Sequence, residues 1–155
     1  MASIQFATTF KGLEHAVFKA SGAQVPAFEQ EVDMPLLLLV SEPQGAMLGT
    51  AVPRATDFNL KWTRGAPDVI VYLTASSDRV DGKAGTSFLS CYIPSEPGAV
   101  AIPGAFLQRL KAGAMVNAYT VHEVTVQAGD YSVLLAIASD LRNAANDGSV
   151  NFILQ

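Results

Sequence analysis

Charged residues are scarce in this chain of 155 residues, at 15% of the sequence against about 25% in an average soluble protein. The ten Lys and Arg residues are scattered singly and the formal net charge is -4, so no basic stripe is available to neutralise phosphates or anionic lipid. Half of the residues are hydrophobic, which is more than a domain of this size can hide. We therefore expect a protein partner or self-association, and we expect no nucleic-acid partner.

Cysteine is nearly absent as well, because Cys91 is the only one. One thiol can form neither an internal disulfide nor a cysteine-based zinc cluster, and we interpret it as a small buried apolar residue. Long apolar runs are also missing. The longest, Pro35–Val40, is far shorter than the about 20 residues of a membrane-spanning helix, so membrane insertion is not expected. The chain as given opens without a basic segment or a long apolar one, which indicates no signal peptide in it.

Short segments in which apolar and polar residues alternate predict an all-β fold. Phe58, Leu60 and Trp62 fall on one face of such a segment, and the polar residues between them fall on the other. We expect Phe58–Thr63 to pair with Asp68–Thr74 as neighbouring antiparallel strands joined by a Gly/Pro turn. The full set of expected strands is Ile4–Phe10, Glu14–Ala20, Ala27–Met34, Leu36–Val40, Phe58–Thr63, Val69–Ala75, Thr86–Ile93, Ala99–Ile102, Val116–Val126, Tyr131–Ser139 and Val150–Leu154.

One short helix is predicted near residues 103–111. Pro103 suits the first turn, Phe106, Leu107 and Leu110 share a face, and Gly113 offers a stop. No repeat or change in composition marks a boundary, so we expect a single domain over residues 1–155. Many short strands separated by Gly/Pro turns predict a β-sandwich or barrel.

The chain resembles uncharacterised bacterial secreted or cell-surface proteins that have immunoglobulin-like or fibronectin-III-like sandwiches. The residues that carry the resemblance are Leu60-Lys61-Trp62-Thr63, Val69-Ile70-Val71, Phe88-Leu89-Ser90-Cys91, Gly98-Ala99-Val100-Ala101-Ile102-Pro103, Phe106-Leu107 and the upstream segment from Phe18 to Pro35. The resemblance covers most of the chain and implies an antiparallel immunoglobulin-like β-sandwich, located outside the cytoplasm or at the cell surface. It brings no enzyme activity with it.

Trp62 is the first candidate for a binding residue, because exposed aromatic rings on β-sandwiches stack on sugars. Its register with Phe58 and Leu60 favours a place in the core instead. His15 and His122 are the only histidines. Each is adjacent to a glutamate on an expected strand, so within each pair the two side chains point to opposite faces and cannot bind the same ion. A zinc or copper site would require both histidines to meet in space with Asp or Glu.

Two oxygen-rich loops are candidates for calcium. Residues 78–82 form one of them, and the second contains Asp140, Asn143 and Asp147, which are the first residues to examine for a metal. Neither loop carries the full alternating ligand set with a closing bidentate Glu. Asx-rich turns also form for local reasons, because their side chains bond to nearby amides. No cofactor is therefore expected, with calcium as the alternative.

Three acids, Glu29, Glu31 and Asp33, alternate along the expected strand at residues 28–34 and so share one face. Paired carboxylates are the machinery of glycoside hydrolysis, which makes a hydrolase the alternative to a protein with no enzyme activity. The simpler interpretation is the solvent-facing side of an amphipathic strand, where like charges also discourage edge pairing.

These observations predict a non-catalytic β-sandwich interaction or assembly module, at a bacterial surface or in a multi-subunit complex. The alternative is a glycan- or calcium-dependent ligand-binding domain. Recognition of a partner would use sheet faces, sheet edges or loops, and the loops at residues 42–54, 76–85 and 140–149 are expected to vary most in shape.

Overall fold

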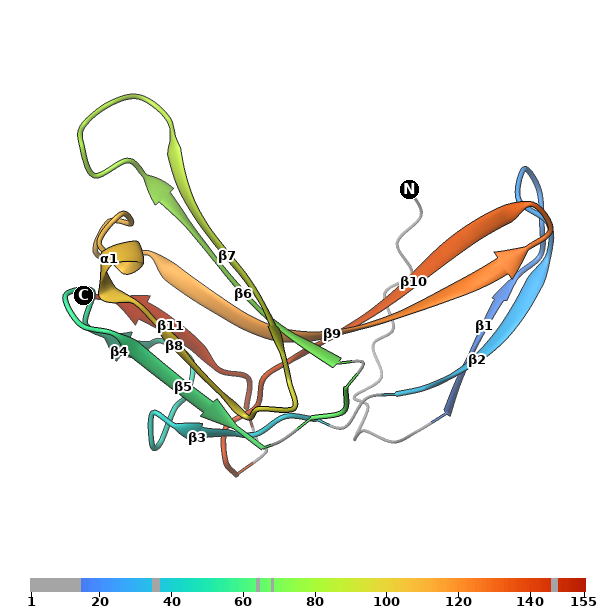
Figure 1. Cartoon of the computed structure of the whole chain (residues 1–155), viewed down its shortest axis with the longest axis horizontal. Coiled ribbons are helices and arrows are strands. Elements are labelled where there is room, and N and C mark those ends of the chain that lie inside the picture. Colours follow the sequence, from blue (N-terminus) through green and yellow to red (C-terminus); the bar gives the residue numbers. More distant parts are fainter. Residues whose placement is uncertain (1–14, 35–36, 64, 68, 146–147) are drawn as a thin grey trace.

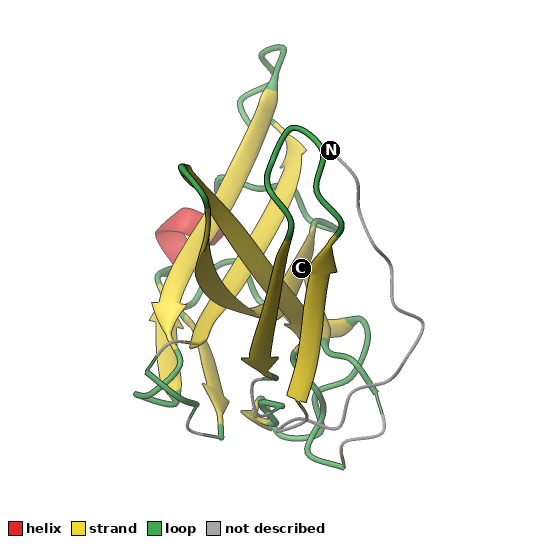
Figure 2. Ribbon diagram, turned by 90° about the vertical axis from the view of Figure 1, so that its right-hand side faces the viewer, coloured by secondary structure: helices red, strands yellow, loops and turns green. Residues whose placement is uncertain are grey.

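The computed structural model describes residues 15–34, 37–63, 65–67, 69–145 and 148–155. This part of the chain is built of β-strands and contains a single short helical turn, seen at the side of the molecule (Figures 1 and 2). The elements are β1 (His15–Ala20), β2 (Phe28–Asp33), β3 (Val40–Glu42), β4 (Thr50–Val52), β5 (Phe58–Trp62), β6 (Val69–Asp78), β7 (Thr86–Pro94), β8 (Ala99–Ile102), α1 (Gly104–Leu107), β9 (Met115–Ala128), β10 (Tyr131–Asp140) and β11 (Asn151–Leu154). The predicted all-β class is confirmed.

The largest sheet has six strands and is organised around β9, which at 14 residues is the longest of them. β6 pairs with one edge of β9, and β7 pairs with the far edge of β6. The other edge of β9 is shared, because β11 pairs with its first residues and β10 pairs with the rest. These pairs are antiparallel, whereas β4 pairs with β11 in parallel.

A second sheet, of three antiparallel strands with β5 between β3 and β8, shares a hydrophobic core with the large sheet. Leu60 of β5 and Leu73 of β6 are both fully buried in this core. The rings of Phe58 in β5 and Phe152 in β11 meet edge to face with their centroids 4.7 Å apart. The two sheets are therefore two layers around one core, as alternating strands with one apolar face require.

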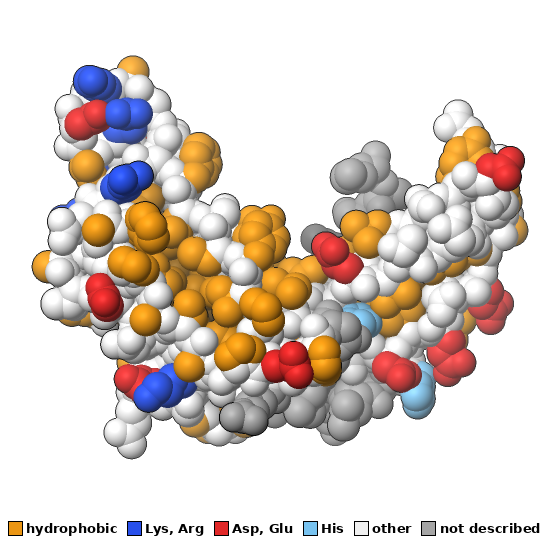
Figure 3. All heavy atoms as spheres, in the orientation of Figure 1, with side chains coloured by type: hydrophobic (Ala, Val, Ile, Leu, Met, Phe, Trp, Pro, Cys, Tyr) orange, Lys and Arg blue, Asp and Glu red, His pale blue; other side chains and the backbone are white. Residues whose placement is uncertain are grey.

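β9 and β10 continue beyond this core as a long hairpin, and the β1–β2 hairpin packs against them (Figure 1). Val32, Met34 and Ile137 form a second, smaller buried core there. One face of β9 serves both cores, since Val116 lies in the main core and Val124 packs against the small one. The β6–β7 hairpin and the β9–β10 hairpin diverge as two arms (Figure 1), and the space-filling view shows a hollow between them (Figure 3).

The predicted pairing of Phe58–Thr63 with Asp68–Thr74 is wrong. β5 lies between β3 and β8, whereas β6 lies between β7 and β9 in the other sheet. Both segments alternate because each faces the shared core from its own layer. Two strands that face each other across a core show the same sequence pattern as two strands that pair, so the pattern could not separate the cases.

The helix lies within the predicted residues 103–111 but has only four residues. Gln108 donates its amide hydrogen to the carbonyl oxygen of Gly104, whereas Arg109 and Leu110 bond to residues three positions back. The chain thus tightens into turns after Leu107 and the helix ends there. Leu36 of the predicted strand Leu36–Val40 lies outside the described residues, and among the rest of that segment only Val40 belongs to a strand, where β3 begins.

One further strand differs from expectation. β4 lies within the segment 42–54, whose turn residues predict a loop, and it has only three residues. The predicted strand Ile4–Phe10 lies outside the described residues. The remaining predicted strands are present, and Ala99–Ile102 has the expected bounds.

Candidate interaction surface

The large sheet has one face that no other sheet covers within the described part of the chain. On β6, Val69, Val71 and Leu73 face the main core, so the residues between them lie on the opposite face. The pairing registers place alternate residues of β7 and β9 on that same face. We call this surface the open face; it comprises Ile70, Tyr72, Thr74, Phe88, Ser90, Tyr92, Met115, Asn117, Tyr119 and Val121.

The open face is rich in exposed apolar and aromatic side chains. Phe88 is 76% exposed and Tyr92 is 71% exposed, both on the outermost strand of the sheet. In the space-filling view, hydrophobic side chains gather along the inner side of the β6–β7 arm and around the base of the hollow (Figure 3). Concentrated exposed apolar surface of this kind marks interaction sites in soluble proteins.

Three tyrosines of the open face contact one another across three adjacent strands. Tyr72 lies directly opposite Tyr92 on one side and Tyr119 on the other. The rings of Tyr72 and Tyr92 stack with centroids 4.2 Å apart, and the ring of Tyr119 meets Tyr72 edge to face at 4.9 Å. The cluster presents ring surface and hydroxyl groups together, a combination that is enriched at interfaces.

Hydrogen bonds and burial shift the pKa values of the three tyrosines in different directions. Bonds from Tyr92 and then Ser90 lower the pKa of Tyr72, because they stabilise its phenolate. The same bond raises the pKa of Tyr92, which acts as the donor to Tyr72. Burial is the main cause that raises the pKa of Tyr119. Tyr72 is therefore the acceptor at the centre of the cluster.

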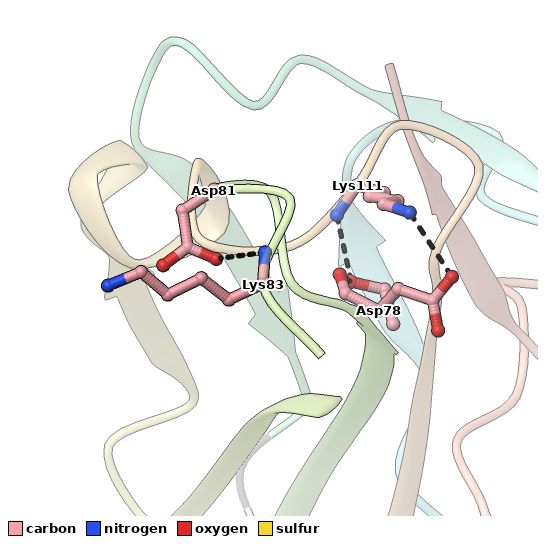
Figure 4. Close-up of polar contacts among 5 residues, drawn as sticks. Asp78, Asp81, Lys83 and Lys111 are labelled. Atoms are coloured by element: carbon pink, nitrogen blue, oxygen red, sulfur yellow. Dashed lines mark hydrogen bonds and ion pairs between the residues drawn. The ribbon is translucent and has the colours of Figure 1, made fainter. Parts of the chain in front are cut away.

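Charged residues gather at the tip of the β6–β7 arm, where Figure 4 shows the contacts of Asp78 with Lys111 and of Asp81 with Lys83. Lys111 Nζ lies 3.1 Å from Asp78 Oδ2. Arg79 binds both carboxylate oxygens of Asp81, with Nε 3.0 Å from Oδ1, and the amide of Lys83 donates to Oδ1 at 3.2 Å. The hydrogen bond from Arg79 is the main reason that the pKa of Asp81 falls to about 2. The carboxylates of the candidate calcium loop 78–82 are thus paired with cations of the same chain.

The second candidate metal loop is also occupied by internal bonds. Asp140 Oδ2 accepts a hydrogen bond from Ser149 Oγ at 2.7 Å, and the amide of Asn143 donates to the carbonyl oxygen of Gly148 at 2.9 Å. Asp147 lies outside the described residues. Within residues that the structure describes, no group of three or more His, Cys, Asp or Glu side chains is placed to hold a metal ion.

The acids of β2 lie on its exposed face, as the alternation predicts. Glu29 Oε2 is 2.9 Å from Lys19 Nζ, and Asp33 Oδ1 is 2.5 Å from His15 Nδ1, both across the β1–β2 pair. Glu31 lies 3.8 Å from the same nitrogen of His15. A glycosidase acid is usually held in a shielded pocket that raises its pKa, whereas these three carboxylates face solvent beside basic side chains.

Three other residues that the sequence analysis considered lie wholly or partly in the interior of the fold. Trp62 is 4% exposed and donates its indole hydrogen to the carbonyl oxygen of Ser95 at 2.8 Å, so the predicted core position is confirmed. His122 is buried whereas Glu123 is exposed, so the two lie on opposite faces as expected. Cys91 is only half-buried at the margin of the main core rather than fully buried, and this burial raises the pKa of its thiol.

The tyrosine cluster was not singled out from the sequence. Its signal is that apolar or aromatic residues stand at both odd and even positions of Val69–Thr74 and Thr86–Ile93. Only one face of such a strand can meet the core of a two-layer fold, so the other must be covered by something else or left open.

Comparison with known proteins gives no indication of function, so the open face is the main evidence. No protein-family model, no curated protein and no solved structure matches the chain. Among the described residues, no helix has the length and apolar character needed to cross a bilayer.

Proposed function

We propose that this chain is a non-catalytic β-sandwich module of immunoglobulin-like type that acts in protein assembly, at a bacterial surface or in a multi-subunit complex. It works by associating with protein, further copies of itself included. The observation that carries the proposal is the open face, where Phe88 and Tyr92 are among the most exposed large hydrophobic residues of the described chain. Interface centres are enriched in tyrosine, phenylalanine and methionine and depleted in charge.

The composition of the open face supports association with protein rather than with a polyanion. Its ten residues include three tyrosines, one phenylalanine and one methionine and carry no charge, and the charged residues that the registers place beside them on the same face, Asp78, Glu123 and Asp140, are all acidic. At the tip of the β6–β7 arm, Arg79 pairs with Asp81 and Lys111 pairs with Asp78. A partner surface that is apolar and hydrogen-bonding therefore fits best.

Light scattering after size-exclusion chromatography tests this proposal at micromolar concentration. We expect a mass above that of one chain, and we expect it to fall when Tyr92→Ser removes an exposed ring from the open face. Phe106→Ser is the matched control, because Phe106 is also exposed but belongs to α1, outside the sheet. A clean monomer, or equal loss of association in both variants, would count against the proposal.

Glycan binding is a second candidate, favoured by the tyrosine cluster. Tyr72, Tyr92 and Tyr119 offer hydroxyl groups beside ring surface, with Ser90 and Asn117 on the same face. Sugars bind where ring faces and hydrogen-bonding groups converge. A glycan array followed by titration with the best sugar tests it. Tyr92→Ala should abolish binding, and Tyr131→Ala should not, because Tyr131 is an exposed tyrosine on the opposite face of the sheet.

A further inference from the structure

We propose that β7 pairs with β7 of a second copy, antiparallel and around a two-fold axis at Ser90, so that two large sheets join into one. This inference rests on the proposed assembly function and names the surface through which copies associate. β7 is the last strand of the large sheet and pairs only with β6 among the described strands. Its outer edge can therefore accept another strand.

The register of β6 and β7 identifies which main-chain groups point outward. The amide of Ser95 donates to the carbonyl oxygen of Val69, and the amide of Arg79 donates to that of Gly85, at the two ends of the pair. Hydrogen-bonded and non-hydrogen-bonded pairs alternate along antiparallel strands. Counting from both ends, Phe88, Ser90 and Tyr92 are at non-hydrogen-bonded positions. Their N–H and C=O groups consequently point away from β6.

β7 lacks the features that protect exposed strand edges. Natural edges carry charged side chains, prolines or bulges that prevent pairing. β7 has no charged residue from Thr86 to Pro94, and its register with β6 is continuous over nine residue pairs. Pro94, which has no amide hydrogen, stands at the very end and limits the available edge to the residues before it. By contrast, Glu29, Glu31 and Asp33 mark β2 with charge.

A two-fold axis at Ser90 satisfies the outward main-chain groups of Phe88, Ser90 and Tyr92 at once. Ser90 then pairs with Ser90 of the second copy, and Phe88 and Tyr92 of each copy pair with Tyr92 and Phe88 of the other. Each of these pairs exchanges two main-chain hydrogen bonds, about six in all. The two exposed aromatic residues of each copy become cross-strand neighbours on the open face, a favourable combination in sheets. Cys91 lies opposite Leu89 in this arrangement, so the native thiols do not meet.

Site-specific cross-linking tests this register. Residues of a hydrogen-bonded antiparallel pair have Cα atoms about 5.5 Å apart, within the range that a disulfide spans. In a Cys91→Ser background, we expect Ser90→Cys to convert most of the protein to a covalent dimer on oxidation. Ser87→Cys in the same background is the control, because residue 87 lies opposite Ile93 of the second copy and should remain uncross-linked.

The outcomes separate this inference from the assembly function. Association by light scattering without a Ser90→Cys cross-link would overturn the β7 pairing and leave assembly standing; β10, a second edge strand with little charge, would be the next candidate. A monomer by light scattering would overturn both. As a second variant, Phe88→Lys should abolish the dimer while the circular dichroism spectrum stays unchanged, because Phe88 is 76% exposed. Phe106→Lys should leave the dimer intact.

Discussion

The indole nitrogen of Trp62 donates a hydrogen bond to the main-chain oxygen of Ser95, 2.8 Å away, and this bond joins the two layers of the fold. Trp62 ends β5 in the three-stranded sheet, and Ser95 directly follows β7 in the large sheet. Ser95 is fully buried, and its hydroxyl donates to the carbonyl oxygen of Ala66 at 2.9 Å. Ser95 therefore ties the end of β7 to the segment that carries the chain from β5 to β6.

Trp62→Phe should lower the free energy of unfolding by about 2 kcal/mol, because it removes this hydrogen bond and leaves unfilled volume in the core. Urea denaturation followed by circular dichroism measures the change. Phe106→Leu, at an exposed position of α1, is the control and should alter stability by less than about 0.5 kcal/mol. An equal effect of the two substitutions would contradict the role assigned to Trp62.

Gly65→Ala should destabilise the protein through a steric conflict with Ser95. A Cβ atom at position 65 would lie 2.0 Å from Ser95 Oγ and 2.5 Å from Ser95 Cβ. We expect a loss of about 2 kcal/mol and partial recovery in the double variant Gly65→Ala/Ser95→Gly, measured as a coupling energy in a double-mutant cycle. Gly148→Ala is the matched control, since its nearest neighbour would be Asn143 Nδ2 at 3.6 Å. Additive effects at positions 65 and 95 would refute the steric explanation.

Ile137→Ala should loosen the second arm without unfolding the main core. Ile137 is one of three buried residues in the small core, so its truncation should lower the local stability of the β1–β2 hairpin by about 2 kcal/mol or more. Hydrogen exchange should accelerate in β1 and β2 and remain slow in β6. Leu134→Ala, on the opposite face of β10 and exposed, is the control. Uniform acceleration across the molecule would show that the two cores unfold together.

Tyr92→Phe should raise the pKa of Tyr72. The hydroxyl of Tyr92 donates to Tyr72 and is the main cause of its lowered pKa, so its removal should return Tyr72 towards the ordinary value of about 10. In the unaltered protein one tyrosine should ionise below the others as pH rises, and this early step should move upward in the variant. NMR of tyrosine labelled at Cζ follows each ring. Tyr131→Phe should leave the Tyr72 titration unchanged.

The sequence predicts individual strands well but not their partners. Phe58, Leu60 and Trp62 alternate as expected and are all buried. The error concerns β6, which shows the same periodicity but lies in the opposite layer. Partner choice depends on contacts between segments that are distant along the chain, such as Phe58 with Phe152, and local periodicity does not contain that information.

The candidate surface was harder to predict than the core. Trp62 attracts attention as the only tryptophan, yet it is buried, whereas Phe88 and Tyr92 are the most exposed aromatic residues of the described chain. Tyr72, Tyr92 and Tyr119 are separated by about 20 or more residues along the sequence, and only the registers of β6 with β7 and β9 bring them side by side. The solvent-facing side of β2 could be predicted, because its acidic residues alternate with apolar ones such as Val32 within a single short segment of the sequence.

The dependence of the β1–β2 hairpin on β9 and β10 has a consequence for folding. The β1–β2 hairpin leaves the ribosome before β9 and β10, the strands that cover its apolar side and include Ile137. Contacts over so long a stretch of chain form slowly. In pulse-labelling during refolding, we expect the amides of β1 and β2 to gain protection after those of β6 and β7, and nascent chains to expose Val32 and Phe18 to chaperones in the meantime.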